Sequence, residues 1–149
     1  MSDEITLERV QALVTRGPYH QWLDLKVIAL HEDGIELKAT WREEWVVNPD
    51  RRYTHGGILA TLIDSVMSAA VHTMLPAGKS YLTRELSVTF HLPVFEKTGE
   101  IMAEGWVVSF EADRATAEGR IIASDQRVYA TGRATCAIFG KSSAAAGSP

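Results

Sequence analysis

A single carboxylate interrupts the longest apolar stretch of this sequence, and it is the first candidate for chemistry. The stretch runs from Ile58 to Leu75, and Asp64 is its only acidic residue. On a helical wheel of about 100° per residue, five of its polar residues fall in one sector about 100° wide. These residues are Thr61, Asp64, Ser65, Ser68 and His72. The pattern predicts a helix that is buried on most sides and carries one narrow polar stripe.

Burial of a carboxylate is costly unless the group is paired or its perturbed acidity serves a purpose. A carboxylate in such a place can act as a general base towards water or as a nucleophile. The simpler interpretation is that Asp64 faces solvent or binds a neighbouring backbone group. The residues before the helix favour the chemical interpretation.

His55, Gly56 and Gly57 stand where the preceding loop becomes this helix. A helix N-terminus offers unpaired N–H groups and the positive end of the helix dipole. Glycine has no side chain, so a substrate carbonyl can approach the backbone closely. This combination is what an oxyanion site requires. Taken alone, the two glycines are equally consistent with a tight turn.

The surrounding segments predict an α+β domain. A short helix beginning near Leu7 ends at Gly17-Pro18, and the strands over 25–30 and 35–41 form a hairpin. A polar loop over 42–54 leads to the apolar helix, which stops at Pro76. After it the hydrophobic period changes to two. Four further antiparallel strands are predicted, over 81–90, 101–110, 115–123 and 128–139.

Length and composition limit what the chain can be. Its 149 residues match one domain of ordinary globular composition, so we predict a single domain over 1–139 and a disordered tail over 140–149. The net charge of −4 argues against nucleic-acid binding, which needs a basic surface. Cys136 is the only cysteine, and we expect it to be a small buried hydrophobic residue.

The apolar stretch 58–75 is long enough to require a membrane test. It contains Asp64 and His72, and a charge at mid-bilayer costs about 2.5–3.5 kcal/mol on insertion scales. The N-terminus, MSDEITLERV, is acidic and does not have the pattern of a secretory signal. We therefore predict a buried helix in a cytoplasmic protein that does not associate with membranes.

The spacing of the polar residues resembles that of a known family. The run HGGILATLID places Asp64 nine residues after His55, in an apolar helix that follows a β-hairpin. This arrangement resembles the hotdog-fold acyl-CoA thioesterases of the phenylacetate-degradation (PaaI-like) family. The segments TRELSVTFHLPV, AEGWVVSFEADRATAEGRI and YATGRATCAIF resemble that family's later strands, so the resemblance covers roughly residues 20–139. It implies a six-stranded antiparallel sheet wrapped around a long central helix.

The resemblance implies hydrolysis of an acyl- or aryl-CoA thioester to the free acid and coenzyme A, in a groove between two subunits. At the matching positions, the N–H of Gly56, beside Gly57, polarises the thioester carbonyl. His55 holds that loop or the thioester end. Asp64 reaches in from the opposite subunit and acts as general base or nucleophile. The sequence does not separate these two roles.

Further site residues follow from the same resemblance. Thr83 matches a Ser or Thr that positions the attacking water in some relatives, and Ser68, one helical turn after the carboxylate, can do the same. Asn48 resembles a family Asn or Gln that contacts the thioester region, but it precedes the histidine by seven residues, where six is usual. His91 stands where many relatives carry an arginine, and we expect it to be exposed.

The phosphates of coenzyme A call for cations at the mouth of the groove. The candidates are Arg51, Arg52, Lys79, Arg84 and Arg114. Trp45, Tyr53, Met67 and Met74 are candidates for the acyl pocket, although core packing explains them equally well. No metal or cofactor is expected, since coenzyme A is part of the substrate. The resemblance also implies a homodimer or homotetramer, and oligomerisation would cover the edge strands of the sheet.

Two other functions are compatible with this fold. Hotdog dehydratases of hydroxyacyl thioesters typically show a His-x-Phe-Pro type motif or a differently spaced His/Asp pair, which this sequence lacks. Non-catalytic acyl-CoA sensors usually carry an attached pair of DNA-binding helices, whereas this chain begins with one short acidic helix. Thioester hydrolysis is therefore the favoured interpretation.

Overall fold

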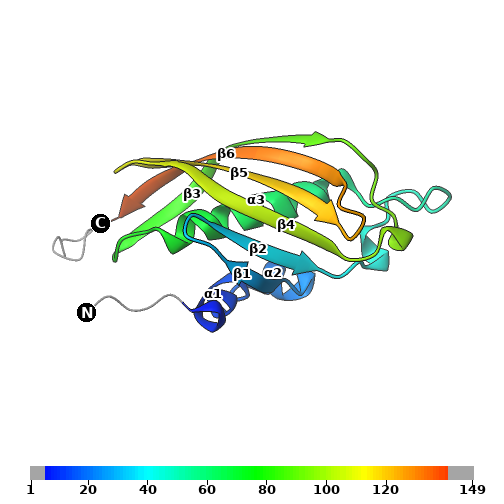
Figure 1. Cartoon of the computed structure of the whole chain (residues 1–149), viewed down its shortest axis with the longest axis horizontal. Helices are drawn as coiled ribbons and strands as arrows, with labels where there is room; N and C mark the ends of the chain where they lie inside the picture. The colour runs from blue at the N-terminus through cyan, green and yellow to red at the C-terminus, as the bar shows by residue number, and fades with distance from the viewer. Residues whose placement is uncertain (1–5, 141–149) are drawn as a thin grey trace.

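The computed structural model of the chain describes residues 6–140 and contains one sheet around one long helix (Figure 1). The helices are α1 (Leu7–Val14), α2 (Pro18–Leu23) and α3 (Gly56–Thr73), with short 3₁₀ turns η1 (Glu43–Trp45) and η2 (Glu96–Thr98). The strands are β1 (Lys26–Leu30), β2 (Gly34–Ala39), β3 (Lys79–Phe90), β4 (Ile101–Phe110), β5 (Arg114–Ala123) and β6 (Val128–Gly140).

The six strands form one antiparallel sheet in the order β1-β2-β4-β5-β6-β3. The sheet curls around α3, which contacts β2, β3, β4, β5 and β6, whereas the edge strand β1 packs against α1 (Figure 1). This confirms the predicted α+β hotdog fold. The edge strand β3 runs beside α3, which brings the two elements that carry the candidate site together.

One glycine of each of three neighbouring strands lets α3 lie close to the sheet. Gly105 of β4 pairs with Gly119 of β5, which pairs with Gly132 of β6. A Cβ on Gly105 would stand 2.7 Å from the carbonyl oxygen of Val66, and one on Gly132 would stand 2.4 Å from Ile63. The backbone of α3 therefore lies against Gly105, and side chains of the same helix lie against Gly119 and Gly132, so the glycine row fixes the height of α3 above the sheet.

The burial of α3 explains its sequence. Nine of its residues are buried, all of them apolar except Ser65. By length and hydropathy alone α3 would pass as a membrane span, but half of that window is buried inside the structure and the sheet wraps around it. A core helix passes the same test, and α3 has that place in this fold.

The N-terminal region differs from the prediction at one point. We expected Gly17-Pro18 to end helical structure, but Pro18 begins a second short helix, α2. Proline is favoured at a first helical position because its missing N–H would have no partner there. The helix ends at Asp24, whose φ of 54° is left-handed. The predicted loop 42–54 contains η1, in which Trp45 is buried. Two isolated β-bridges, Val46 with Thr54 and Tyr53 with Phe95, hold this segment in place.

The predicted domain and tail boundaries remain predictions. Of the predicted tail, 140–149, residue 140 is the last residue of β6, and the others lie outside the described residues. Cys136 is buried with no exposed surface, as expected from its apolar surroundings.

Candidate active site

The Asp64 carboxylate is held by two hydroxyl groups from different elements. The Thr83 hydroxyl of β3 donates to its Oδ1 at 2.8 Å, and the Ser68 hydroxyl, one turn further along α3, lies 3.4 Å from the same oxygen. The two hydroxyl oxygens are themselves 3.3 Å apart. Within residues 6–140, Oδ2 has no hydrogen-bond donor, so this oxygen is available to a water or a substrate. The residue is half-buried.

The polar stripe of α3 divides into two groups with different neighbours. Thr61 and Ser65 face α2, where the Thr61 hydroxyl contacts the Tyr19 hydroxyl at 2.8 Å and the Ser65 hydroxyl contacts Nε2 of His20 at 2.9 Å. Asp64, Ser68 and His72 instead face β3. Thr61 and Ser65 therefore make structural contacts, whereas the three residues that face β3 belong to the candidate site.

The β3 side of the stripe continues beyond the carboxylate. The rings of His72 and Tyr81 meet edge to face, with centroids 5.6 Å apart. Burial lowers the pKa of the His72 imidazole, so the ring is neutral at neutral pH. Burial raises the pKa of the Tyr81 phenol, and the negative charge of Asp64 acts in the same direction.

Cys136 lies on the strand next to β3 and approaches the same group. Its Sγ is 4.0 Å from the Thr83 hydroxyl oxygen. Burial raises the pKa of the Cys136 thiol, and the Asp64 charge acts in the same direction against a hydrogen bond with Thr83. The residue is therefore a protonated thiol that packs behind the threonine rather than a nucleophile.

The N-terminus of α3 leaves one backbone donor without a partner. His55 is the N-cap, and its ring Nδ1 accepts the Gly57 N–H at 2.7 Å. The His55 N–H donates to the Trp45 carbonyl at 2.8 Å, and the Ile58 N–H donates to the His55 carbonyl at 2.9 Å. Within the described part of the chain, the Gly56 N–H has no acceptor. It is the donor that the resemblance assigned to the thioester carbonyl.

Gly56 and Asp64 are far apart within one chain. They are eight positions apart on α3, which is about 12 Å along the axis at 1.5 Å per residue. A single thioester carbonyl cannot reach both groups of the same helix. The ring of Phe90, at the end of β3, covers Gly56, with ring carbons 3.2–3.6 Å from the position that a Cβ would take.

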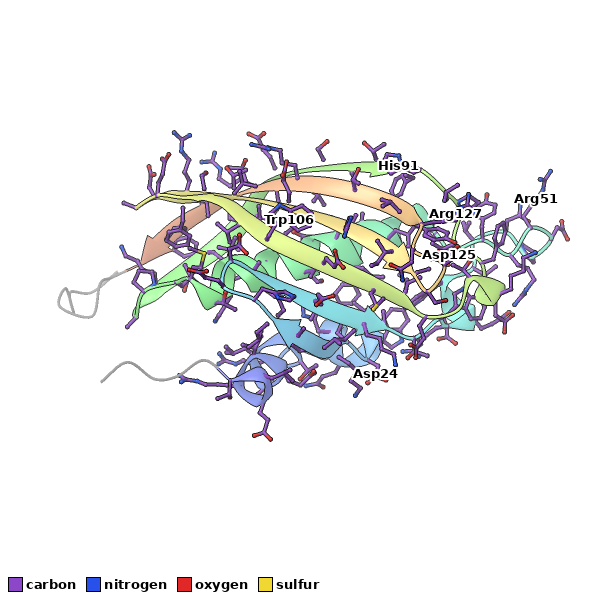
Figure 2. All side chains as sticks on the ribbon, in the orientation of Figure 1. Asp24, Arg51, His91, Trp106, Asp125 and Arg127 are labelled. Carbon is purple, nitrogen blue, oxygen red and sulfur yellow. The ribbon has the colours of Figure 1, made fainter. Side chains whose placement is uncertain are left out.

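The loop that precedes His55 is organised by Asn48. Its side-chain oxygen accepts the N–H groups of Asp50 and Arg51, at 2.9 and 3.1 Å. The Asn48 carbonyl oxygen therefore shapes its own turn, and its amide nitrogen is the group left for a substrate. Arg52 is bound to Glu43 at 2.5 Å, and this contact raises its pKa. Arg51 is exposed at the tip of the loop and points outward (Figure 2).

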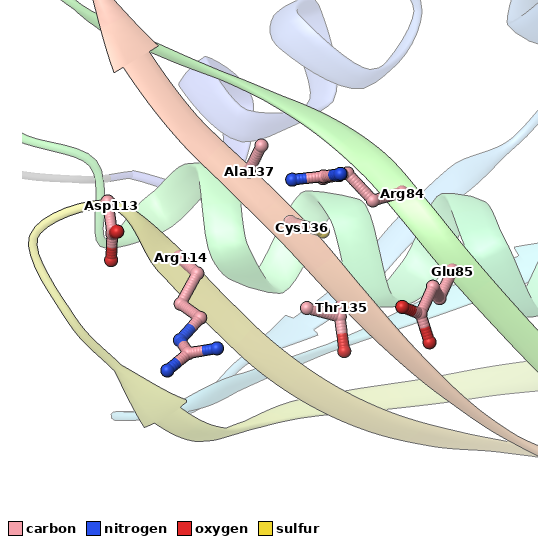
Figure 3. A pocket seen from close by; sticks show the side chains of 7 residues that line it. All are labelled: Arg84, Glu85, Asp113, Arg114, Thr135, Cys136 and Ala137. Carbon is pink, nitrogen blue, oxygen red and sulfur yellow. The ribbon is translucent and has the colours of Figure 1, made fainter.

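The other candidate cations lie elsewhere. Lys79 donates to the Gly140 carbonyl at 3.0 Å. Arg84 and Arg114 line one pocket of about 240 Å³ together with two acidic residues, Glu85 and Asp113 (Figure 3). The register of β3 shifts between Thr83 and Glu85, so alternation from Thr83 does not place Arg84. The pocket lies on the face of the sheet away from α3, because its lining residues Arg114, Thr135 and Ala137 alternate along their strands with buried residues.

The remaining candidates are mainly structural or exposed. Trp45 and Met67 are fully buried in the core, Tyr53 is half-buried, and Met74 is 39% exposed. His91 is exposed, as expected, and its Nε2 contacts the Thr131 hydroxyl at 2.9 Å (Figure 2). Within residues 6–140, no group of three or more His, Cys, Asp or Glu side chains has the arrangement of a metal site.

Sequence reasoning missed two participants of the site. Tyr81 stands two residues before Thr83, and in a strand that spacing puts both side chains on one face. His72 was recognised only as a member of the polar stripe. The alternation of β3 was thus the signal that could have placed both residues next to the carboxylate.

Comparison with known proteins identifies the family and the fold. A model of the thioesterase superfamily matches residues 52–130. A thioesterase-superfamily protein of known structure is 38% identical, with 88% of this chain and 96% of that chain covered and a TM-score of 0.79. The search of curated proteins found no match.

More distant structures share the fold. A thioesterase from Haemophilus influenzae is 20% identical, with 93% of each chain covered and a TM-score of 0.82. The PaaI protein from the phenylacetic acid degradation operon of Escherichia coli is 18% identical, with 91% of this chain and 94% of that chain covered and a TM-score of 0.79.

Proposed function

The chain belongs to the thioesterase superfamily and has the hotdog fold of PaaI-like proteins, and on this basis we propose that it hydrolyses acyl-CoA thioesters. The products are a free acid and coenzyme A, and Asp64 is the catalytic carboxylate. The observation that carries the proposal is the arrangement of Asp64, with one oxygen held by two hydroxyls and the other without a partner among residues 6–140. A carboxylate anchored in this way is fixed in direction and still able to react.

The reaction has two chemically balanced forms. As a general base, Asp64 takes a proton from water while the water oxygen bonds to the thioester carbon. The tetrahedral intermediate then expels the coenzyme A thiolate, which takes up that proton. As a nucleophile, an Asp64 oxygen bonds to the thioester carbon, the C–S bond breaks, and the coenzyme A thiolate leaves and takes a proton from solvent. Water then hydrolyses the resulting mixed anhydride, which releases the free acid and regenerates the Asp64 carboxylate. In both forms Thr83 and Ser68 hold the carboxylate, and either hydroxyl can position the water.

The proposed carbonyl donor is the Gly56 N–H of a second subunit. This N–H has no acceptor in the described part of its own chain and lies at the positive end of α3. It is about 12 Å along the helix from Asp64 of the same chain, so one active site needs two copies of the chain. His55 and Gly57 then hold the N-terminal turn in shape through their 2.7 Å contact.

The edge strand β3 is the surface on which we expect the second subunit. It presents the large apolar side chains Leu82, Leu86 and Phe90, which are 62%, 41% and 51% exposed. An unpaired edge of this kind favours pairing with another strand. Pairing β3 with its copy across a twofold axis would cover these side chains and place the Asp64 side of α3 at the interface.

We propose that the phosphates of coenzyme A bind to positively charged side chains among the five candidates. Arg51 fits best, because it is exposed and has no ion-pair partner within residues 6–140. Arg52 and Lys79 have protein contacts that a phosphate would have to replace. Arg84 and Arg114 would reach coenzyme A only around the sheet edge, so they rank behind the loop residues. The Asn48 amide nitrogen is the group of that residue available to the thioester region.

A thiol-release assay on the purified protein tests the proposal. Wild type is given a panel of aryl-, medium-chain and long-chain acyl-CoA thioesters, beside Asp64→Asn and the control Asp33→Asn. Asp33 is an exposed aspartate on the turn between β1 and β2. We expect thiol release with wild type and the control, and a loss of at least about 10²-fold in Asp64→Asn. Binding of acyl-CoA without any thiol release would instead identify a non-catalytic acyl-CoA-binding protein.

A further inference from the structure

Four polar side chains form a continuous row from the middle of α3 to its C-terminal end. Asp64 contacts Ser68 at 3.4 Å, His72 follows Ser68 by one helical turn on the same face of α3, and Tyr81 of β3 meets His72 edge to face at 5.6 Å. All four are half-buried, so they are accessible but not freely solvated. We call these residues, Asp64, Ser68, Tyr81 and His72, the polar row. Its last two members have no part in the hydrolytic steps described above.

The far end of the polar row has unused hydrogen-bonding capacity. Within residues 6–140, neither ring nitrogen of His72 has a hydrogen-bond partner. A neutral imidazole carries one donor and one acceptor, and the Tyr81 hydroxyl offers both functions. These groups are half-buried and lie on the same helix face as the Asp64 carboxylate, so they are placed to bind a polar group of a ligand that reacts there.

The charge of the row restricts what that ligand group can be. His72 is neutral because of its burial, and Tyr81 is a neutral phenol. An anionic group would be repelled by the Asp64 carboxylate without any cation in the row to compensate. An amide or a hydroxyl group matches one donor and one acceptor on each side chain.

The length of the row matches one substrate spanning it. Ser68 lies about 6 Å and His72 about 12 Å from Asp64 along the helix axis. A hydroxyl on an aryl acyl group reaches the nearer part of this span from the thioester carbon, and the two amides of the pantetheine arm reach its nearer and farther parts. The acyl group and the pantetheine arm would each present the same kind of group, a neutral hydrogen-bonding group on one side of the reacting carbonyl.

We propose that His72 and Tyr81 form a specificity subsite that binds a neutral amide or hydroxyl group of the thioester substrate. The inference rests on the proposed function, because it takes the carboxylate end of the row as the reacting end. The simpler role of the pair is structural, as an aromatic contact that fastens the end of α3 to β3. Substrate discrimination separates the two roles, because a purely structural contact does not distinguish ligands.

The test uses variants that keep the aromatic contact and remove the hydrogen bonds. Tyr81→Phe removes one oxygen, and His72→Phe keeps a ring edge without nitrogen atoms. His31→Phe is the matched control, since His31 is exposed and pairs with Glu36 on the outer face of the sheet. Melting temperatures of all variants report on any structural role.

The ligands are non-hydrolysable thioethers, so that binding is measured by calorimetry without turnover. One pair, S-phenacyl-CoA and its 4-hydroxyphenacyl analogue, probes the acyl side. A second pair, the S-phenacyl derivatives of pantetheine and of 1-butanethiol, probes the amide side. We expect wild type to prefer the hydrogen-bonding member of one pair by about 3- to 10-fold, and both variants to lose most of that preference.

Each outcome decides the question. Loss of discrimination in the first pair assigns the subsite to the acyl group, and loss in the second pair assigns it to pantetheine. Unchanged ratios in both variants, with or without a lower melting temperature, would overturn the inference. If wild type binds with these ratios but releases no thiol from any acyl-CoA, the hydrolytic function fails while the subsite stands.

Discussion

The proposed chemistry depends on two positions of α3, one that must supply a carboxylate and one that must supply a backbone N–H. Asp64 must keep one oxygen free while the other is held, and the hydroxyls of Thr83 and Ser68 accomplish this. Gly56 must present an N–H that nothing else accepts, and the His55 cap satisfies the next N–H while leaving that one open. Each position suggests a substitution that removes one function with little change of shape.

Gly56→Pro should remove the proposed carbonyl donor and leave the helix intact. Gly56 is the first residue of α3, where proline is favoured, and His55, at φ −56° and ψ 132°, has the extended conformation that suits a residue before proline. We expect kcat to fall by about 10²–10³-fold, as for loss of one oxyanion donor. Circular dichroism should show unchanged helix content.

Gly56→Ala is the matched control for this variant. It adds the same Cβ, which meets the Phe90 ring at 3.2 Å, but keeps the N–H. Because Phe90 is exposed, the ring can shift, and we expect a much smaller loss than with proline. Equal kcat values for the two variants would remove the Gly56 N–H from the mechanism.

Thr83→Val should slow turnover by loosening Asp64. Valine has nearly the same shape as threonine, but it cannot donate to the carboxylate at 2.8 Å. Hydrogen bonds to charged groups are the stronger ones, so we expect kcat to fall by about 10-fold or more. Thr131→Val, which removes the contact with His91, should leave kcat unchanged. A wild-type kcat in Thr83→Val would mean that the carboxylate needs no such support.

At the level of single residues, the sequence indicated the carboxylate of Asp64 and the hydroxyls of Ser68 and Thr83 near it. Asp64 and Ser68 lie one turn apart on a helix with strong periodicity, and their proximity follows from helix geometry alone. The contact of Tyr81 with His72 could not be derived in that way. It depends on the height at which β3 crosses α3, which is a property of the tertiary packing.

Among the elements, the glycine row controls where α3 lies. A Cβ on Gly105 would stand 2.7 and 2.8 Å from the carbonyl oxygen and carbon of Val66, and these backbone atoms cannot move aside as a side chain can. We expect Gly105→Ala to lower the free energy of unfolding by about 1–3 kcal/mol. Chemical denaturation measures this change.

A second glycine provides the control for this prediction. A Cβ on Gly17 has no neighbour within 4 Å, so Gly17→Ala should preserve both stability and kcat. Gly105→Ala should also reduce kcat, because a displaced α3 moves Asp64 away from Thr83. Wild-type stability of Gly105→Ala would show that α3 is not seated on the glycine row.

The contact between α3 and β3 should make stability sensitive to mild acid. The His72 pKa is lowered in the folded state, whereas the unfolded chain has an imidazole pKa of about 6.5. Unfolding therefore takes up a proton below that pH, and stability decreases as the pH falls through this range. We expect the loss in melting temperature between pH 7.5 and 5.5 to be smaller in His72→Phe. An equal loss in both proteins would contradict a buried neutral His72.

The elements themselves were largely predictable from periodicity. The strand 101–110 was predicted with the bounds that β4 has, because its alternation is regular and turns flank it. The helix α2 was missed because Gly17-Pro18 is a stop signal at a helix end and a start signal at a helix beginning. The glycine row was visible as an isolated glycine within each of three strands, but its meaning depends on which strands are neighbours.

At the scale of the whole molecule, the proposed mechanism requires two copies of the chain for one complete site. The carboxylate and the free N–H belong to the same helix about 12 Å apart, and the edge strand beside them exposes three large apolar side chains. The resemblance suggested a shared site from the sequence, and the geometry of α3 supplies an independent physical reason. A dimer or tetramer remains a prediction, which light scattering at micromolar concentration tests.

Subunit mixing tests the central claim most directly. Asp64→Ala and Gly56→Pro, each inactive alone, are mixed under conditions in which subunit exchange is proven by a tag on one variant. If Asp64 of one subunit works with Gly56 of the other, each mixed dimer has one intact site and one doubly damaged site. We predict that thiol release from acyl-CoA recovers to about a quarter of the wild-type rate, since half of the dimers are mixed and each has one of two sites intact. No recovery despite proven exchange would contradict the account, because it would place both residues in the site of a single subunit.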